Sequence, residues 1–423
     1  MVRVSGPASL AAIEPFFDRH ADLQPRQAVY GRLNHPDLGD DVFDDCVVTF
    51  FKSPASATGE DLVEISIHGG EYLQKTLLKA LTHQPGVRLA DPGEFTLRAF
   101  LNGRIDLTRA EAVADLIHAR DVASHRAARQ QLHGALAQRL ESYRQQIMDI
   151  LVQIEVELDF SEHEIDFTPL EAHSAILDGV LADVRSLLKT HFYGRRIQEG
   201  FRVPLIGVPN AGKSTLFNAL LGHERAIVND TPGTTRDTIE ASFSLGAHTL
   251  ILVDTAGVHS ADDQIEQSGI DRSLEELQRA DLVLLVNSTD TPGAKLELPP
   301  ATPAIAVHTK CDADPGTEID GLPVSGKTAE GLDELLSAIQ TRIDALAAGL
   351  GDGVVLTHYR HSEILERFAD QLRAAQKAVL DGLGPEYVAA DLRESLHVLG
   401  ELTGETTPED ILNTIFAGFC VGK

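Results

Sequence analysis

The chain has 423 residues, 43% of them hydrophobic and 24% charged, with a formal net charge of −28 at pH 7. This length allows two or three domains, and the acidic balance excludes a broadly basic nucleic-acid surface, because phosphate binding rests on lysine and arginine. No apolar run reaches the roughly 18 residues of a membrane helix, and the three widely spaced cysteines predict neither disulfides nor a zinc site, so we expect a cytoplasmic protein without membrane contact.

Residues 1–98 mix short strand patterns with turns. The stretches CVVTFF (46–51) and DLVEISIHGG (61–70) are typical of strands, and the second alternates between apolar and polar residues. The stretch EYLQKTLLKALTH (71–83) predicts a helix. We therefore expect a compact α+β domain over residues 1–98.

Residues 99–198 change to a helical pattern. Apolar residues recur at helical spacing from about 105 to 160, and no proline occurs between Gly93 and Thr168, so long helices are allowed. An acidic break, DFSEHEIDFTP (159–169), precedes a further helix that ends near Lys189. Residues 98–144 hold eight arginines against five acids, and solvated helix faces are the simplest interpretation of this excess.

Residues 199–350 alternate strands and helices, as an α/β domain does. GLGDG (349–353) is typical of a linker, and residues 351–423 are helical again. Two helical stretches, 99–198 and 351–423, therefore flank the α/β block. This arrangement predicts an inserted α/β domain, with both helical stretches packed as one domain.

The strongest single motif is GVPNAGKS, residues 207–214, which follows an apolar strand and opens an amphipathic helix. It matches the phosphate-binding loop in its required strand–loop–helix context. The glycines allow backbone N–H groups to point at phosphates, and the helix N-terminus favours an anion. Lys213 can reach the β- and γ-phosphates, and the Ser214 hydroxyl can bind Mg²⁺.

Three later segments predict a guanine-nucleotide switch. TPGTTRD (231–237) offers the hydroxyls of Thr234 and Thr235 to Mg²⁺, and LILVDTAG (250–257) ends a strand with Asp254 and with Gly257, whose N–H can sense the γ-phosphate. AIAVHTKCD (304–312) brings Asp312, whose carboxylate can accept both donors of the guanine edge. VSGKT (324–328) follows the next strand.

The residue after DTAG is Val258, where small GTPases often have a glutamine that orients the attacking water. Valine cannot polarise water. The chain is therefore an inactive hydrolase, receives a residue from a partner, or uses another internal acid or base. The amide oxygen of Asn210 could hold a monovalent cation between phosphates, which would replace an arginine finger electrostatically.

The C-terminal segment IFAGFCVGK (415–423) places a lone cysteine fourth from the end. A prenylation box is one interpretation, but Gly422 and Lys423 fit it poorly. The preceding stretch ILNTIFAGF is apolar at helical spacing, so we expect it to hold the terminus in a core.

Taken together, these motifs resemble one family, the tRNA-modification GTPases called MnmE or TrmE. The resemblance covers essentially the whole chain and also rests on RVSGP near the start, TGEDLVEISIHGG, PGEFTLRAFLNGRIDLTRAEAVADLI and the tail FCVGK. It implies a folate-binding, aminomethyltransferase-like N-terminal domain, a helical domain and an inserted Ras-like P-loop GTPase domain. It also implies a homodimer that forms a heterotetramer with an MnmG-like FAD protein. That complex would modify C5 of the wobble uridine of certain tRNAs, using GTP, Mg²⁺, K⁺ and a 5-formyltetrahydrofolate or tetrahydrofolate derivative.

The resemblance assigns roles residue by residue. Ser214 and Thr235 match Mg²⁺ ligands, and Asn210, Asn229, Thr231 and Thr234 match the K⁺ site. Glu266 matches the glutamate that orients water, and Cys420 matches a cysteine implicated in modification. Arg3, Glu64, Arg104 and Lys423 match folate-binding positions. The candidate GTP-binding residues are Asn210, Ala211, Gly212, Lys213, Ser214, Thr215, Asn229, Asp230, Thr231, Pro232, Gly233, Thr234, Thr235, Asp254, Thr255, Ala256, Gly257, Thr309, Lys310, Asp312, Ser325, Gly326 and Lys327.

The chain departs from the family pattern in four places. It begins at MVRVSGP, without the strand and glycine-rich loop that usually come first, so we expect the folate domain to be shortened at its start. Arg104 replaces a lysine of some members, Thr309 replaces the usual asparagine, and SGK replaces SAK. A regulatory or ribosome-assembly GTPase, and a folate-binding scaffold, stay open as alternatives.

Overall fold

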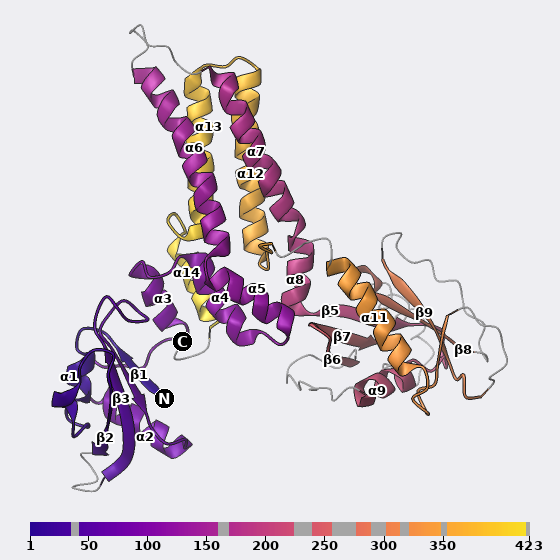
Figure 1. Cartoon of the computed structure of the whole chain (residues 1–423), viewed down its shortest axis with the longest axis horizontal. Helices are drawn as coiled ribbons and strands as arrows, with labels where there is room; N and C mark the ends of the chain where they lie inside the picture. The colour runs from indigo at the N-terminus through magenta and orange to yellow at the C-terminus, as the bar shows by residue number, and fades with distance from the viewer. Residues whose placement is uncertain are drawn as a thin grey trace. The chain divides into compact units, whose positions relative to one another are not determined.

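The computed structural model describes residues 1–34, 42–159, 169–223, 239–255, 276–288, 302–313, 321–347 and 353–419. The chain divides into two compact units, coloured by residue number in Figure 1. Unit 1 comprises residues 1–114, 131–167 and 385–423, and unit 2 comprises residues 115–130 and 168–384. No helix among the described residues is long and apolar enough to span a membrane.

Unit 1 begins with an antiparallel sheet. Its strands lie in the order β1-β4-β3-β2 and comprise β1 (Val2–Ser5), β2 (Ala28–Asn34), β3 (Val42–Phe51) and β4 (Leu62–Ser66). Helices α1 (Ser9–Ile13) and α2 (Glu71–Thr82) contribute to its core, while η1 (His20–Asp22) is a short 3₁₀ turn. The strands and the helix expected here are confirmed, although the sequence patterns did not indicate β1, β2 or α1.

The remaining elements of unit 1 are helical. They are α3 (Glu94–Leu101), most of α4 (Leu107–His118), α6 (Ala135–Asp159), α13 (Pro385–Thr403) and α14 (Glu409–Ala417). The apolar periodicity of residues 105–160 therefore belongs to three helices, because α5 (Val122–Leu132) intervenes. A left-handed glycine, Gly134 with φ of 84°, separates α5 from α6. This backbone conformation is one that side-chain-bearing residues rarely adopt, so the break favours glycine.

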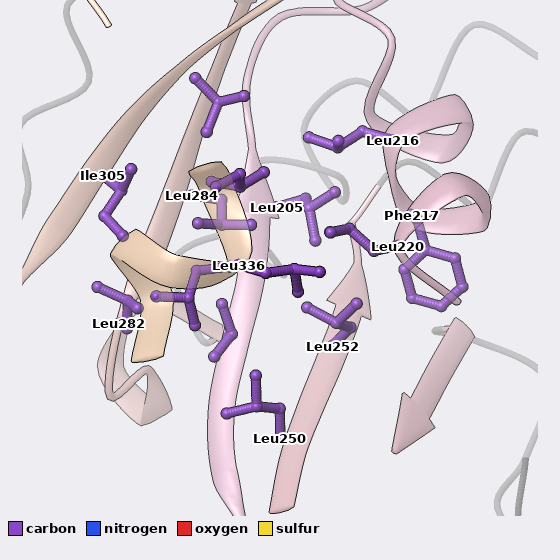
Figure 2. Packing of buried hydrophobic residues seen from close by; sticks show 14 of the residues in the cluster. Leu205, Leu216, Phe217, Leu220, Leu250, Leu252, Leu282, Leu284, Ile305 and Leu336 are labelled. Atoms are coloured by element: carbon purple, nitrogen blue, oxygen red, sulfur yellow. The ribbon is translucent and has the colours of Figure 1, made fainter. Parts of the chain in front are cut away.

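Unit 2 contains a six-stranded sheet in the order β10-β9-β8-β5-β7-β6. Its strands are β5 (Phe201–Ile206), β6 (Ile239–Leu245), β7 (His248–Asp254), β8 (Val283–Ser288), β9 (Ala304–Thr309) and β10 (Leu322–Val324), and only β6 runs antiparallel to its neighbour. One face is covered by α9 (Lys213–His223) and α11 (Leu332–Ala347). Figure 2 shows Leu216 and Leu220 of α9 beside Leu205 of β5, within this apolar core.

Helices before the α/β block pair with helices after it inside each unit. In unit 1, α6 lies along α13, and in unit 2, α7 (Leu170–Lys189) lies along α12 (Tyr359–Leu380), as Figure 1 shows. Helix α8 (His191–Glu199) connects α7 to β5. This pairing is what an inserted α/β block requires, and the domain boundaries at residues 98, 198 and 350 stay a prediction.

Candidate functional site

The phosphate-loop motif follows β5, the strand of unit 2 at which the order of the strands in the sheet reverses. Strand β5 pairs with β7 on one side and with β8 on the other. The strands that follow β5 in the sequence therefore lie on both sides of it, β6 and β7 on one side and β8, β9 and β10 on the other. In open α/β sheets, ligands bind at the carboxyl ends of strands at this switch point. Residues 207–212 follow the carboxyl end of β5 directly and so occupy the expected binding position.

The loop keeps its shape through residues that tolerate unusual backbone conformations. Gly207 faces β8, and a Cβ there would lie 2.1 Å from the carbonyl oxygen of Val286, so no larger residue fits. Asn210 and Gly212 have φ of 64° and 88°, in the left-handed region that glycine and asparagine tolerate best. Helix α9 then begins at Lys213. The chain thus forms the strand–loop–helix turn that directs N–H groups and a helix N-terminus toward one point.

The Lys213 side chain lies across this loop. Its Nζ donates hydrogen bonds to the carbonyl oxygens of Gly207 at 2.7 Å and of Val208 at 3.0 Å. The residue is buried, and this burial lowers its pKa, while the Asp254 carboxylate acts in the opposite direction. The ammonium group is therefore held in place before any phosphate arrives, so little rotamer entropy remains to be lost on binding.

Thr309 joins the loop to the strand ends around it. Its buried hydroxyl is directed at two carbonyl oxygens, that of Ala211 in the loop and that of Asn287 in β8, 3.1 Å away. Gly212 packs on the same side chain, since a Cβ there would be 3.0 Å from Thr309 Oγ1. Threonine therefore supplies a link between the phosphate loop and the segment that carries Asp312, in the position where the family pattern has asparagine.

Removing this hydroxyl should loosen the loop. Thr309→Val removes the hydroxyl that donates to the buried Ala211 carbonyl oxygen, so we expect a loss of about 1–3 kcal/mol of stability and weaker GDP binding. Calorimetry checks this, because bound GDP raises the melting temperature of the transition that belongs to the nucleotide-binding unit. Thr341→Val is the matched control, since its exposed hydroxyl donates to the Ser337 carbonyl oxygen of the same helix. Equal melting temperatures for the two variants would contradict the link.

The other described candidates surround the same loop. Asp254 ends β7 and is buried, and the neighbouring Thr255 hydroxyl donates to the Leu205 carbonyl at 2.7 Å. The Ser214 side chain is exposed in the first turn of α9, while Asp312 is exposed just after β9. A buried acid and an exposed hydroxyl are the donor set that hydrated Mg²⁺ uses beside phosphates, so these residues fit a metal–nucleotide complex.

The segment after β10 closes this side of the site. The buried Ser325 hydroxyl accepts hydrogen bonds from the backbone N–H groups of Lys327 and Thr328 at 3.3 and 3.2 Å. Gly326 lies against the start of α9, and a Cβ there would be 3.0 Å from Thr215 Cγ2. The glycine of SGK therefore lets this segment lie close to α9. With alanine at this position, Thr215 or the segment itself would have to move slightly.

Several sequence candidates lie outside the described residues. These are Asn229, Asp230, Thr231, Pro232, Gly233, Thr234, Thr235, Ala256, Gly257, Glu266, Cys420 and Lys423. The structure therefore brings Asp254, Thr309 and Gly326 to the loop and the start of α9. It does not test the predicted K⁺ site or the glutamate.

In unit 1, two of the predicted folate residues meet directly. Arg3 of β1 and Glu64 of β4 are register partners, and Arg3 Nε donates to Glu64 Oε1 at 2.8 Å. Arg104 is exposed after α3, where its Cγ lies 3.1 Å from the position of a Cβ on Gly59. Gly59 follows Thr58, whose hydroxyl is 2.7 Å from that of Ser5 on β1. Arg104 therefore lies near the end of the strand that carries Arg3.

A charged network that the motifs did not indicate lies beside this strand. The buried Glu94 accepts hydrogen bonds from Arg88, from the N–H of Asp91 and from Arg98, which also bonds Glu60 at 2.9 Å. Burial opposes ionisation of Glu94, but these hydrogen bonds outweigh it and lower its pKa to about 2. The interpretation of the arginine excess as solvated helix faces is therefore wrong for Arg98.

The C-terminal helix packs into unit 1, as the apolar spacing predicted. Phe416 and Phe419 are buried with Leu107 in a small apolar cluster. Gly93 touches them, and a Cβ there would lie 2.6 Å from the Phe416 carbonyl oxygen and 3.0 Å from Phe419 Cβ. The last described residue, Phe419, thus lies at the start of α3, next to the Glu94 network.

Comparison with known proteins gives matches over the whole chain. The family model of the GTP-binding protein TrmE N-terminus matches residues 1–104, and that of the MnmE helical domain matches residues 107–420. The tRNA modification GTPase MnmE of Syntrophotalea carbinolica is 41% identical over all of this chain and 96% of its own length. That of Methylorubrum populi is 43% identical over all of this chain and 94% of its own. The solved FeoB G-domain from Methanococcus jannaschii is 27% identical over 34% of this chain and 98% of its own, with a TM-score of 0.26.

Proposed function

The chain belongs to the MnmE family of tRNA modification GTPases, and from this membership we propose that it hydrolyses GTP and acts in tRNA modification. The observation that carries the proposal is the phosphate loop, held at the switch point of the sheet by Lys213 and Thr309. These groups belong to the same chain that matches both family models. The phosphate loop and the segments that carry the family resemblance therefore belong to one polypeptide.

The residues divide the work of nucleotide binding. Backbone N–H groups of residues 207–214 would hold phosphate oxygens, and Lys213 would neutralise the charge that develops on them. Ser214 and Thr235 would bind Mg²⁺, with Asp254 behind them. The exposed Asp312 would accept the two donors of the guanine edge, because a carboxylate offers acceptors only. Mg²⁺ supplies Lewis-acid stabilisation of the phosphate oxygens when it is bound.

Hydrolysis without a glutamine after DTAG needs another arrangement. We propose that Asn210, Asn229, Thr231 and Thr234 hold K⁺, and that Glu266 orients the attacking water. The conformation of Asn210 supports the proposed K⁺ site. Its backbone is left-handed, and its exposed side chain belongs to the loop whose N–H groups would bind phosphate. A cation there would stabilise the charge of the transition state, as an arginine finger does.

Potassium dependence tests this arrangement. We expect the rate of phosphate release to be at least about tenfold higher in KCl than in NaCl, and Asn210→Ala to remove the difference. Glu266→Ala should abolish turnover while GTP affinity stays near that of the wild type. Equal rates in both salts would reject the K⁺ site, and normal turnover of the Glu266 variant would reject that residue.

Unit 1 supplies the groups proposed for modification. We propose that Arg3, Glu64, Arg104 and Lys423 bind a 5-formyltetrahydrofolate derivative, and that Cys420 acts near the transferred carbon. The Arg3–Glu64 pair, with Arg104 beyond Gly59 and Phe419 beside Gly93, supports a common location in unit 1. Exposed Tyr30 and Val47, which are register partners on β2 and β3, support homodimerisation through this sheet. The remaining partners are an MnmG-like FAD protein, in a heterotetramer, and tRNA in the cytoplasm.

Nucleoside analysis of tRNA is the decisive experiment. A bacterial strain that lacks its own MnmE-type gene should regain aminomethyl or carboxymethylaminomethyl groups at C5 of the wobble uridine when it carries this gene. We expect Cys420→Ser and Arg3→Ala to lose modification and keep GTP hydrolysis, with Arg3→Ala also weakening 5-formyltetrahydrofolate binding in calorimetry. Unchanged wobble uridines with active GTP hydrolysis would instead favour a regulatory or ribosome-assembly GTPase.

A further inference from the structure

Arg202 of β5 joins two parts of unit 2 that are distant in the sequence. Its Nε and Nη2 donate to the two carboxylate oxygens of Glu276 at 2.7 and 3.1 Å, and Nη2 also donates to the carboxylate of Glu240 on β6. The side chain of Glu276 is 10% exposed and that of Arg202 is 19% exposed. One guanidinium therefore bridges two carboxylates, and the closer pair is largely removed from solvent.

The bridge lies on the face of the sheet opposite α9 and α11. Side chains alternate along a strand, and Val203 belongs to the core beneath those two helices, so Arg202 points to the other face. On that face, Leu277 belongs with Ile206 to a separate buried cluster. Glu276 is thus part of a helical turn that packs near Ile206, the last residue before the phosphate loop.

The second carboxylate, that of Glu240, belongs to the part of β6 beside Asp254. Glu240 follows Ile239, the register partner of Asp254 at the carboxyl end of β7. In the sequence, Thr235 lies five residues before Glu240, and five residues of extended chain span at most about 18 Å. Arg202 therefore holds the strand that leads directly from a residue proposed to bind Mg²⁺.

The main chain of Arg202 is fixed separately from its side chain. The buried Asp281, just before β8, accepts hydrogen bonds from the Arg202 N–H at 2.9 Å and from the Arg196 guanidinium of α8. The Asp281 N–H donates in turn to the Arg202 carbonyl oxygen at 2.9 Å. A change of the Arg202 side chain therefore leaves these main-chain bonds of β5 in place.

The bridge is better suited to fixing geometry than to adding stability. Burial opposes the charge of Arg202, but the hydrogen bonds to Glu276 and Glu240 outweigh it and raise the pKa of the guanidinium. Apolar residues of similar volume often replace a buried ion pair without loss of stability. Apolar contact is not directional, whereas a guanidinium bonded through two nitrogens sets the orientation of its partner.

We propose that Arg202 is a positioning residue for GTP hydrolysis, acting through Glu240 and Glu276. Thr235 precedes the first of these carboxylates by five residues and Glu266 precedes the second by ten, and the inference rests on the roles proposed for these two residues. Arg202 itself is five residues, roughly 17 Å along an extended strand, from the start of the phosphate loop. Its loss should therefore lower kcat without weakening nucleotide binding.

The double variant Arg202→Met/Glu276→Met tests this role. It removes both charges of the more buried pair, so it leaves no nearly buried carboxylate unpaired, and the main-chain bonds to Asp281 persist. We expect kcat for GTP hydrolysis to fall by at least about tenfold, because small displacements of reacting groups are expensive, while GDP affinity changes by less than about twofold. The melting temperature should stay equal or rise. Phosphate release, calorimetry with GDP and thermal unfolding measure these three quantities.

Arg195→Met/Glu199→Met is the matched control, because it removes an exposed ion pair of 3.1 Å within α8. It should keep the kcat of the wild type. A double variant at Arg202 and Glu276 with the wild-type kcat would overturn the proposal, and so would a parallel loss of kcat, GDP affinity and melting temperature, which a general loss of structure produces.

Hydrogen exchange of the GDP-bound protein adds a measurement that needs no hydrolysis. Amides of β6 and of residues 276–280 should exchange faster in the Arg202→Met/Glu276→Met protein than in the wild type, and at equal rates in the control. A wild-type chain that binds GDP but releases no phosphate from GTP would count against the proposed function. Unchanged exchange in β6 and in residues 276–280 would overturn the positioning role in either case.

Discussion

Lys213→Met should lower kcat for GTP hydrolysis by at least about 1000-fold, which corresponds to about 4 kcal/mol of transition-state stabilisation. Methionine keeps the length of the aliphatic chain and removes the ammonium group. The Gly207 and Val208 carbonyl oxygens then lose their donor, at 2.7 and 3.0 Å, and the phosphate oxygens lose the only cation that the described part of the loop holds. Phosphate release at saturating GTP measures the effect.

The control for this variant is another lysine of unit 2. Lys189 is exposed at the end of α7 and belongs to none of the nucleotide-binding motifs, and Lys189→Met should hydrolyse GTP at the wild-type rate. Circular dichroism of both variants checks that the fold is intact. A Lys213→Met protein that stays within tenfold of the wild-type rate would show that the loop does not hold the γ-phosphate.

Asp312→Asn should exchange the base specificity of the site. The carboxylate accepts both donors of guanine, whereas an asparagine amide offers one acceptor and one donor. Xanthine presents a carbonyl where guanine has an amino group, so it matches the amide. We expect GTP affinity to fall by at least about 100-fold and xanthosine triphosphate to become the preferred ligand, because a site built for hydrogen bonds rejects a mismatched partner strongly.

Competition between the two nucleotides measures this exchange. Asp333→Asn is the matched control, since its side chain is 83% exposed near the start of α11. The wild type should prefer GTP despite the threonine at position 309, because Thr309 contacts the protein backbone rather than the base. An Asp312→Asn protein that still prefers GTP would place the base elsewhere.

Some features followed from sequence because they depend on neighbouring residues. The phosphate loop is an example, since two left-handed positions, at Asn210 and Gly212, and a helix start at Lys213 lie within four residues. The C-terminal core is another, because the spacing of Phe416 and Phe419 already indicated one buried side. In both cases the local pattern and the tertiary contacts favour the same conformation.

Other features lay beyond any local pattern. The periodicity of residues 105–160 did not show where one helix ends, because apolar spacing continues across the break at Gly134, which is set by a left-handed backbone conformation. The sequence named Thr309 only as a departure from asparagine, while its bond to Ala211 joins residues 98 positions apart. The Glu94 network was missed although Arg88 and Arg98 lie within six residues of Glu94, and only its bond from Arg98 to Glu60 joins segments that are distant in the sequence.

By itself, then, the sequence determined the type of chemistry, since glycine, lysine, serine and aspartate at fixed spacing specify a guanine-nucleotide loop through local backbone geometry. The tertiary structure decided which groups hold that loop still, because carbonyl oxygens of Ala211 and Asn287 reach one hydroxyl only after β5, β8 and β9 are side by side. Strand order and packing between distant residues leave no periodic trace in the chain.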